Sequence, residues 1–125
     1  MRSLLDTQIV IWSFNEPERI SPKLKSFLDI EDNELFVSCL SFYEIEQKRN
    51  SGKLDFNYDF RSIIHEGYFK VIDLKMDHIH QIKKLPWIHK DPFDRLMIAQ
   101  SIVERIPLIT ADKQIQQYDF PHVKA

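Results

Sequence analysis

Short apolar runs alternate along the chain with longer stretches in which apolar and polar residues are mixed. The runs are three to four residues long and rich in leucine and β-branched residues, as is typical of strands buried on both faces of a sheet. The predicted strands are 3–5, 35–38, 69–72 and 107–110, and Val123 is a candidate for a last edge strand. The chain is therefore predicted to form a sheet of four to five short strands.

Helices are predicted between these strands, because capping residues and prolines precede stretches with apolar residues at helical spacing. The predicted helices are 9–14, 23–30 after Ser21 and Pro22, 41–50, 59–66, 77–84 and one that begins at Asp91-Pro92, with Ile115 on a single turn. Strands that alternate with helices predict an α/β fold with a parallel sheet covered on both faces. The length of 125 residues favours a single domain, 1–125.

Acidic residues follow the predicted strands or open the helices beside them. Asp6 follows the first strand, Asp112 follows the fourth, and Asp94 opens the helix that leads into the fourth; Glu44 lies on the helix after the second strand. Ligands of such sheets bind at the carboxyl ends of the strands, so these acids are expected to converge. Grouped carboxylates need a cation, and Mg²⁺ and Mn²⁺ prefer oxygen ligands. Such ions support hydrolysis of phosphodiesters.

Each acid also has a purely structural explanation. Asp6 and Asp112 each stand where a strand ends and a helical turn begins, so either could be only a cap. Glu44 stands three residues after Ser41, the spacing of a capping box. Asp94 lies in the first turn of its helix, where the helix dipole favours a negative charge. Taken singly, none of the four is specific for chemistry.

Composition and charge exclude several other classes of protein. The formal net charge is −2, so bulk charge offers no attraction for nucleic acid. With Cys39 alone there is no disulfide framework and no four-cysteine metal site. Two glycines are too few for a phosphate-binding loop. No apolar run is long enough to span a membrane, and no signal peptide is recognisable, so a cytoplasmic protein is expected.

Four segments of the chain together resemble a known family. They are Leu4–Trp12; Val37–Ile45 with Lys48 and 52–54 downstream; Leu85-Pro86, His89 and Asp91–Gln100; and Pro107–Asp112. In this order and spacing they resemble PIN-domain ribonucleases, specifically toxins of the VapC type. The resemblance spans nearly the whole chain, and its third segment, with Asp91-Pro92-Phe93-Asp94-Arg95, is the most specific. It implies the PIN fold, a three-layer α/β sandwich, for residues 1–125.

The resemblance also implies a function and its residues. It implies a Mg²⁺- or Mn²⁺-dependent endoribonuclease, the toxin of a type II toxin–antitoxin pair. The family's four acidic positions correspond to Asp6, Glu44, Asp94 and Asp112. Asp6 and Asp94 are the most dependable metal ligands by this resemblance, and the other two complete the pocket or hold a second ion. Thr7 and Thr110 are expected to orient carboxylates or water.

Two neighbours of Asp94 have secondary roles by the same resemblance. Asp91 is expected to cap the helix, with a direct catalytic role as the alternative. Arg95 is expected either to contact a phosphate or to pair with a neighbouring acid. The chain departs from the family pattern at Gln8, where a histidine is common in this subgroup. The departure removes no ligand but puts substrate contacts or local packing in question.

Two functional hypotheses from different classes stay open at this point. The first is the metal-dependent endoribonuclease, with RNA as substrate, a cognate antitoxin and a second copy of the chain as partners, and no membrane. The second is a catalytically degenerate PIN fold that binds RNA or protein, since a fold alone does not prove a function. Internal neutralisation of the acids by lysine or arginine would favour the second. A receiver-like domain is a third interpretation, but no fitting sequence surrounds Asp73 after the third strand.

Overall fold

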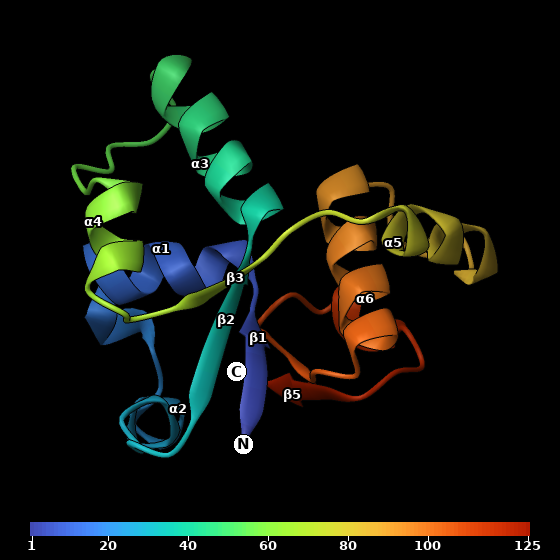
Figure 1. Cartoon of the computed structure of the whole chain (residues 1–125), viewed down its shortest axis with the longest axis horizontal. Coiled ribbons are helices and arrows are strands. Elements are labelled where there is room, and N and C mark those ends of the chain that lie inside the picture. The colour runs from blue at the N-terminus through green and yellow to red at the C-terminus, as the bar shows by residue number, and fades with distance from the viewer.

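The computed structural model describes all residues, 1–125, and contains one five-stranded parallel sheet (Figure 1). The strands are β1 (Arg2–Leu5), β2 (Glu34–Ser38), β3 (Lys70–Ile72), β4 (Leu108–Thr110) and β5 (His122–Lys124). Their order in the sheet is β3-β2-β1-β4-β5, and every neighbouring pair runs parallel. The predicted parallel sheet is confirmed, including the edge strand at Val123.

Six α-helices and three short 3₁₀ helices connect the strands. They are α1 (Thr7–Asn15), η1 (Pro17–Arg19), α2 (Pro22–Leu28), α3 (Cys39–Asn50), α4 (Phe60–His65), α5 (Met76–Gln81), η2 (Ile82–Lys84), α6 (Pro92–Glu104) and η3 (Ile115–Gln117). Five of the predicted helices, and the turn at Ile115, form within a few residues of their expected bounds. The segment predicted as one helix over 77–84 is instead α5 followed by η2. No helix of the chain is both long and apolar enough to cross a bilayer.

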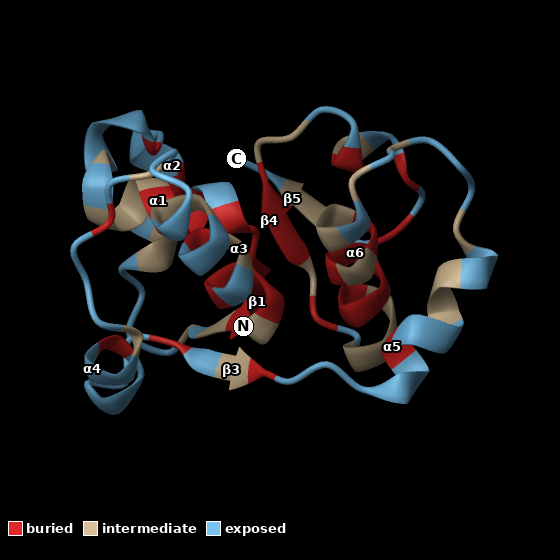
Figure 2. Ribbon diagram, turned by 90° about the horizontal axis from the view of Figure 1, so that it is seen from above, coloured by how far each residue is buried: buried red, intermediate tan, exposed pale blue.

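The two faces of the sheet are covered by different helices, because strand residues alternate between them. Leu5, Val37 and Ile109 belong to a core cluster with residues of α1 to α4. Leu4 and Leu108, one position earlier on their strands, belong to a second cluster with residues of α6. Figure 2 shows α1 and α2 on one side of β4, with α5 and α6 on the other. The fold is therefore the predicted three-layer sandwich.

The strand order creates a crevice between β1 and β4. The chain proceeds outward from β1 through β2 to β3, then returns past α6 to β4 on the other side of β1. Such a reversal opens a ligand site beyond the carboxyl ends of the two central strands. Asp6 directly follows β1, and Asp112 stands two residues after β4. The topology therefore brings together two acids that lie far apart in the sequence.

The start of α3 differs from the prediction. The helix begins at Cys39, and Ser38 is its cap, with an Oγ that accepts from the Leu40 N–H at 3.1 Å. Ser41 thus lies inside the helix, where its hydroxyl is 2.8 Å from that of Thr7. The capping box of Ser41 with Glu44 is therefore wrong, because the serine nearest the strand end caps first. Glu44 has no capping duty.

Candidate metal centre

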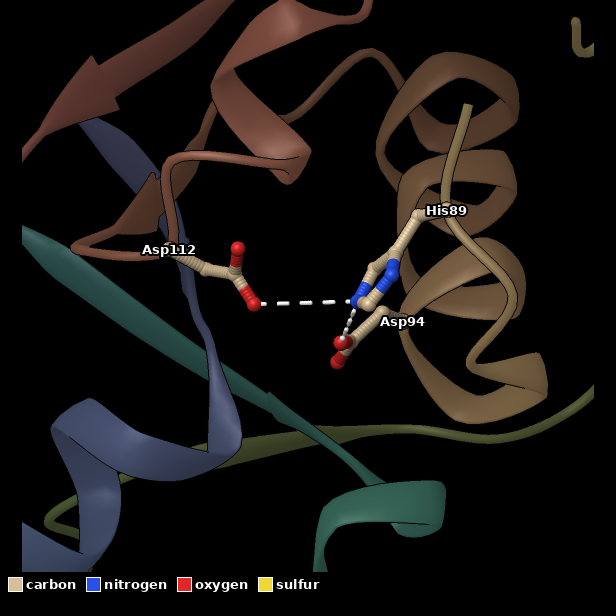
Figure 3. Close-up of side chains that lie close together, drawn as sticks. All are labelled: His89, Asp94 and Asp112. Atoms are coloured by element: carbon tan, nitrogen blue, oxygen red, sulfur yellow. Dashed lines mark hydrogen bonds and ion pairs between the residues drawn. The ribbon is translucent and has the colours of Figure 1, made fainter. Parts of the chain in front are cut away.

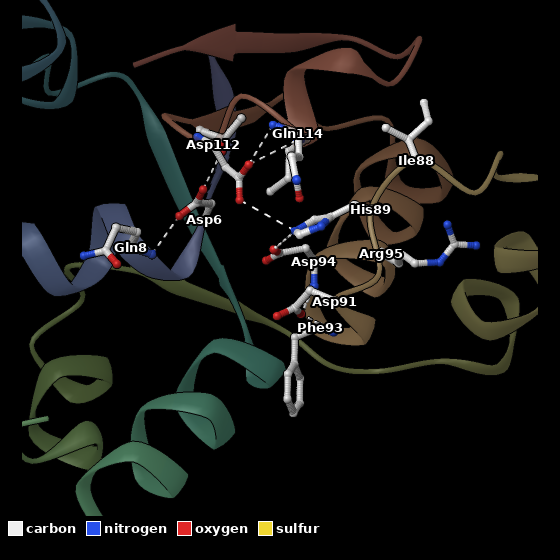
Figure 4. Close-up of polar contacts among 12 residues, drawn as sticks. Asp6, Gln8, Ile88, His89, Asp91, Phe93, Asp94, Arg95, Asp112 and Gln114 are labelled. Atoms are coloured by element: carbon white, nitrogen blue, oxygen red, sulfur yellow. Dashed lines mark hydrogen bonds and ion pairs between the residues drawn. The ribbon is translucent and has the colours of Figure 1, made fainter. Parts of the chain in front are cut away.

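All four predicted acids line one pocket at the carboxyl end of the sheet. The pocket has a volume of about 410 Å³ and is lined by Asp6, Thr7, Gln8, Trp12, Glu44, Lys48, His89, Asp91, Asp94, Ala111 and Asp112. Figure 4 shows the side chains of Asp6, Asp91, Asp94 and Asp112 directed toward a shared space. Five carboxylates therefore meet in one hollow, from helices and loops of four separate parts of the chain.

Asp6 combines a structural role with a position in the pocket. As the N-cap of α1, its Oδ1 accepts from the backbone N–H of Gln8 at 2.7 Å and of Ile9 at 3.3 Å. Its Oδ2 accepts a short hydrogen bond from the hydroxyl of Thr110. These bonds fix the carboxylate in one orientation although the residue is buried. The capping interpretation and the functional one are thus compatible.

Asp112 also has both a structural role and a position in the pocket. Its Oδ1 accepts from the backbone N–H of Gln114 at 2.8 Å and of Ile115 at 3.4 Å, which closes the turn after β4. Its Oδ2 is turned toward the pocket and lies 3.7 Å from Nε2 of His89. Thr110 also accepts from the Asp112 N–H at 3.0 Å. Because this threonine contacts both acids, its predicted role in orienting carboxylates fits the geometry.

Asp91 and Asp94 share the start of α6. Asp91 is the N-cap, as predicted: its Oδ1 accepts from the N–H of Phe93 at 2.9 Å and of Asp94 at 3.0 Å. Asp94 needs no partner within the helix, and its side chain points into the pocket. There its Oδ2 accepts from Nε2 of His89 at 2.7 Å (Figure 3). The proline-started helix therefore aims Asp94 at the other acids.

His89 is the pocket residue whose position was not expected. It is not among the four predicted acids, yet its ring lies between Asp94 and Asp112 (Figure 3). The three residues each offer one ligand atom, and these atoms all lie within 4.8 Å of one another. The sequence carried a signal, because His89 stands five residues before Asp94 in the most specific segment. Only the loop geometry shows that its ring turns inward.

Burial and crowding raise the pKa values of two of these carboxyl groups. The pKa of Asp94 is raised to about 7, mainly by desolvation and then by the charge of Asp91, against the lowering effect of the His89 hydrogen bond. The pKa of Asp6 is also raised, mainly by desolvation, although the hydrogen bond from Thr110 opposes the shift. Burial first, and neighbouring acids second, therefore disfavour the charged form of both carboxyl groups. A divalent cation would favour the charged form.

Glu44 and Lys48 form the lower wall of the pocket on α3. Their Nζ–Oε2 distance is 3.0 Å, and they stand four residues apart on one helix face. Glu44 keeps only 16% of its side-chain surface exposed, whereas Lys48 keeps 42%. The lysine therefore neutralises one acid from the solvent side. No lysine or arginine forms an ion pair with Asp6, Asp94 or Asp112.

Arg95 does not line the pocket, and the predicted pairing with a neighbouring acid is wrong. Its guanidinium is buried and donates to the carbonyl of Pro86 at 2.9 Å and to the hydroxyl of Tyr118 at 3.0 Å. It also stacks over the ring of Trp87 at 4.7 Å. Figure 4 shows the side chain directed away from the acids. Because it lies one residue after Asp94 on a helix, it must project about 100° away and instead fixes the loop that carries His89.

Thr7 serves the packing of two helices. Its hydroxyl is hydrogen-bonded to that of Ser41, which joins α1 to α3, and it contacts no carboxylate. The expectation that Thr7 orients a carboxylate is therefore not met. The remaining donor set of carboxylates and one imidazole still fits a hard divalent ion. Asp6, Glu44, Asp94 and Asp112, with His89, are the residues that could hold it.

Comparison with known proteins gives the same family as the sequence pattern. Residues 3–121 match the family model described as the PIN domain. The chain therefore belongs to the PIN domain family. Members of this family are nucleases, and PIN domains generally use a divalent metal. No curated protein matches the chain in sequence.

Solved structures with a similar fold come from toxin–antitoxin complexes. VapBC2 from Rickettsia felis bound to a DNA fragment from its promoter matches with a TM-score of 0.72 and 17% identity, covering 99% of this chain and 98% of the other. A toxin–antitoxin complex from Klebsiella pneumoniae matches at 0.67 and 19%, covering 98% and 96%. DNA-bound VapBC from Salmonella typhimurium matches at 0.70 and 10%, covering 99% and 97%. At these identities the likeness concerns the fold.

Proposed function

We propose that this chain is a VapC-type toxin that hydrolyses RNA phosphodiester bonds with bound Mg²⁺ or Mn²⁺. The observation that carries the proposal is the meeting of five carboxylates in one pocket, two of them with raised pKa values and no lysine or arginine partner. Like charges are gathered in this way at functional sites far more readily than in packing cores. The family's nuclease chemistry agrees with such a pocket.

The residues of the pocket have different roles in the proposed hydrolysis. Asp6, Glu44, Asp94 and Asp112 would hold the metal, which when bound supplies charge to the scissile phosphate and makes water more acidic. Thr110 holds Oδ2 of Asp6 in place, so that this ligand atom needs no reorganisation. Glu44 or Asp112 would accept the proton of the attacking water. Lys48 is placed to bind a phosphate oxygen at the rim.

Cleavage of defined RNAs tests this proposal. Single-stranded and structured RNAs are incubated with the chain in Mg²⁺ or Mn²⁺, and with EDTA as control. Attack by water does not use the ribose 2′-hydroxyl, so a substrate with 2′-deoxyribose at the cleaved position should still be cut. Cleavage that persists in EDTA, or that requires the 2′-hydroxyl and leaves cyclic phosphates, would overturn the mechanism.

Partners follow from the same proposal. An antitoxin protein is the expected inhibitor, since the structures of similar fold were determined as toxin–antitoxin complexes. A second copy of the chain is the other expected partner. Its candidate surface is the apolar one around α5 and η2, where Met76 is 75% and Trp87 71% exposed. Light scattering of the chain and of a Met76→Ser/Trp87→Ser variant tests this, with a dimer expected only for the first.

One observation favours the second candidate function, a degenerate binding module. Lys48 pairs with Glu44, and Nε2 of His89 lies 2.7 Å from Asp94 and 3.7 Å from Asp112, so that basic side chains of the chain itself face three of the four acids. Asp6 has no such partner, which favours the enzyme. Calorimetric titration with Mn²⁺ separates the two candidates. Binding that is lost in Asp6→Asn supports the nuclease, whereas absence of binding would move the assignment to the binding module.

A further inference from the structure

We propose that Trp12 and Arg19 form a nucleobase subsite beside the acidic pocket, which receives the base of a nucleotide adjoining the cleaved phosphate. This inference rests on the proposed ribonuclease function and extends it to the recognition of the substrate. It assigns to Trp12 the role of a stacking platform. The proposed ligand of the hollow that these residues line is single-stranded RNA.

Trp12 separates two hollows of the surface. On α1 it stands four residues after Gln8, on the same helix face, and both line the acidic pocket. Trp12 also lines a second hollow of about 280 Å³, between α1, η1 and α2. Ala111, which precedes the acidic Asp112, lines both hollows as well. The second hollow therefore adjoins the acidic pocket, and the two share a wall formed by Trp12 and Ala111.

The lining of the second hollow suits a base better than a phosphate. Ile9, Ile20 and Leu24 form its apolar floor, and none of them offers a polar atom from its side chain. Arg19 covers one side of the hollow, with its guanidinium 5.4 Å from the centre of the Trp12 ring. Single-stranded RNA is recognised by stacking of splayed-out bases on aromatic rings and on guanidinium planes. The hollow offers both kinds of plane.

Two details indicate that these side chains are not there for packing alone. The indole N–H of Trp12 is buried and has no acceptor, an arrangement that a residue chosen only for packing would avoid. The one ion pair of Arg19 is with Glu16, at 3.6 Å, and both side chains are about half exposed. Such a surface pair is weak, so the guanidinium is free to shift toward a base or its phosphate.

A nucleotide is favoured over a protein segment because the second hollow shares a wall with the acidic pocket. A strand of RNA whose phosphate sits at the carboxylates must place its next base within one nucleotide of that point. Trp12, together with Thr7 and Gln8, forms the wall of the acidic pocket on the α1 side. A docking peptide needs no such link to the acids. Arg19 also supplies a positive charge for the RNA backbone, beside Glu18 in the lining of the same hollow, whereas the acidic pocket supplies little.

Fluorescence of Trp12 tests the subsite without requiring cleavage. In a Trp87→Phe background Trp12 is the only tryptophan, and Ca²⁺ replaces Mg²⁺ to prevent turnover. A short single-stranded RNA should quench the emission, and the same RNA with an abasic site at the position next to the cleaved phosphate should quench it much less. Equal quenching by both oligonucleotides would overturn the proposal.

Kinetics with matched variants provide the second test. Trp12→Leu keeps an apolar side chain but removes the stacking face, whereas Trp12→Phe keeps a ring. We expect KM to rise about 5-fold or more in Trp12→Leu, with kcat little changed, and to recover largely in Trp12→Phe. The abasic substrate should raise KM in the natural chain but not further in Trp12→Leu. Equal melting temperatures of the two variants exclude a folding effect.

The outcomes separate this inference from the proposed function. RNA cleavage with unchanged KM in Trp12→Leu would overturn the subsite and leave the nuclease standing. Base-dependent quenching without any cleavage would support the subsite and overturn the proposed nuclease function. If Trp12→Leu instead loses only the binding of a partner protein, the hollow belongs to that partner and the nucleobase proposal fails.

Discussion

The hydroxyl of Thr110 donates a hydrogen bond to Oδ2 of Asp6, a contact that spans 104 residues of sequence. Both residues stand at the carboxyl ends of neighbouring parallel strands, β1 and β4. The bond holds the most buried of the pocket's acids and, through the N–H of Asp112, the loop that carries a second one. It is the link by which the sheet determines the geometry of the proposed metal centre.

Removal of this hydroxyl should weaken metal binding more than folding. Thr110→Val keeps the volume but leaves Oδ2 of Asp6 without its donor, so we expect Mn²⁺ affinity to fall about 10- to 100-fold. Thr7→Val is the matched control, since Thr7 bonds to Ser41 and to no carboxylate. Calorimetry should show the loss in the first variant only. Equal losses in both would contradict the assigned role of Thr110.

The raised pKa of Asp94 predicts how metal affinity depends on pH. With a pKa of about 7, this carboxyl is protonated below neutrality in the metal-free chain, and an ion must displace the proton. Affinity for Mn²⁺ should therefore fall as pH is lowered from 7 to 5.5, by up to about tenfold per unit. Titrations at several pH values measure this slope. A flat profile across that range would show that Asp94 is not a ligand.

The same shift makes a charged Asp94 unfavourable for folding when no metal is bound. The folded chain binds more protons than the unfolded chain between pH 3.8 and about 7, so stability falls as pH rises through this window. Asp94→Asn removes the charge. At pH 8 in EDTA it should melt about 3 °C higher than the natural chain, after allowance for solvent screening. At pH 4 the two should differ little, and the reverse pattern would refute the assignment.

Substitution of Arg95 is expected to lower the stability of the fold and to leave metal binding by the folded protein almost unchanged. Truncation of Arg95 to Ala leaves the carbonyl of Pro86 and the hydroxyl of Tyr118 unpaired in a buried place. We expect the free energy of unfolding to fall by about 1–3 kcal/mol. Because the guanidinium points away from the acids, Mn²⁺ affinity of the folded variant should change less than twofold. A larger change would mean that the loop of His89 depends on it.

Lys48 offers a test of phosphate binding at the rim of the pocket. Lys48→Met removes its charge, keeps most of the apolar stem and leaves the carboxylate of Glu44 unpaired. If the lysine binds one phosphate, RNA binding should weaken and its dependence on the logarithm of salt concentration should become shallower by about 0.7. Lys53, which does not line the pocket, is the control. If the salt dependence of RNA binding is unchanged in Lys48→Met, Lys48 does not contact a phosphate.

The fold and the convergence of the four acids could be predicted from the sequence, because both follow from the order of strands and helices along the chain. Alternating strands and helices imply a parallel sheet, and the carboxyl ends of β1 and β4 necessarily meet. The inward turn of His89 and the outward turn of Arg95 could not be predicted, because both depend on loop and helix phase around Asp94. The start of α3 was also missed, since Ser38 and Ser41 are equally good caps by type and only the strand end decides between them.

The most direct test of the central claim is the rate of RNA cleavage by the natural chain and by Asp94→Asn, each in Mg²⁺, in Mn²⁺ and in EDTA. Asp94 is the acid that α6 aims at the pocket and whose pKa is raised to about 7, mainly by desolvation. We predict cleavage by the natural chain with either metal, none in EDTA, and none above background for a folded Asp94→Asn. Undiminished cleavage by that variant, or cleavage in EDTA, would contradict the account.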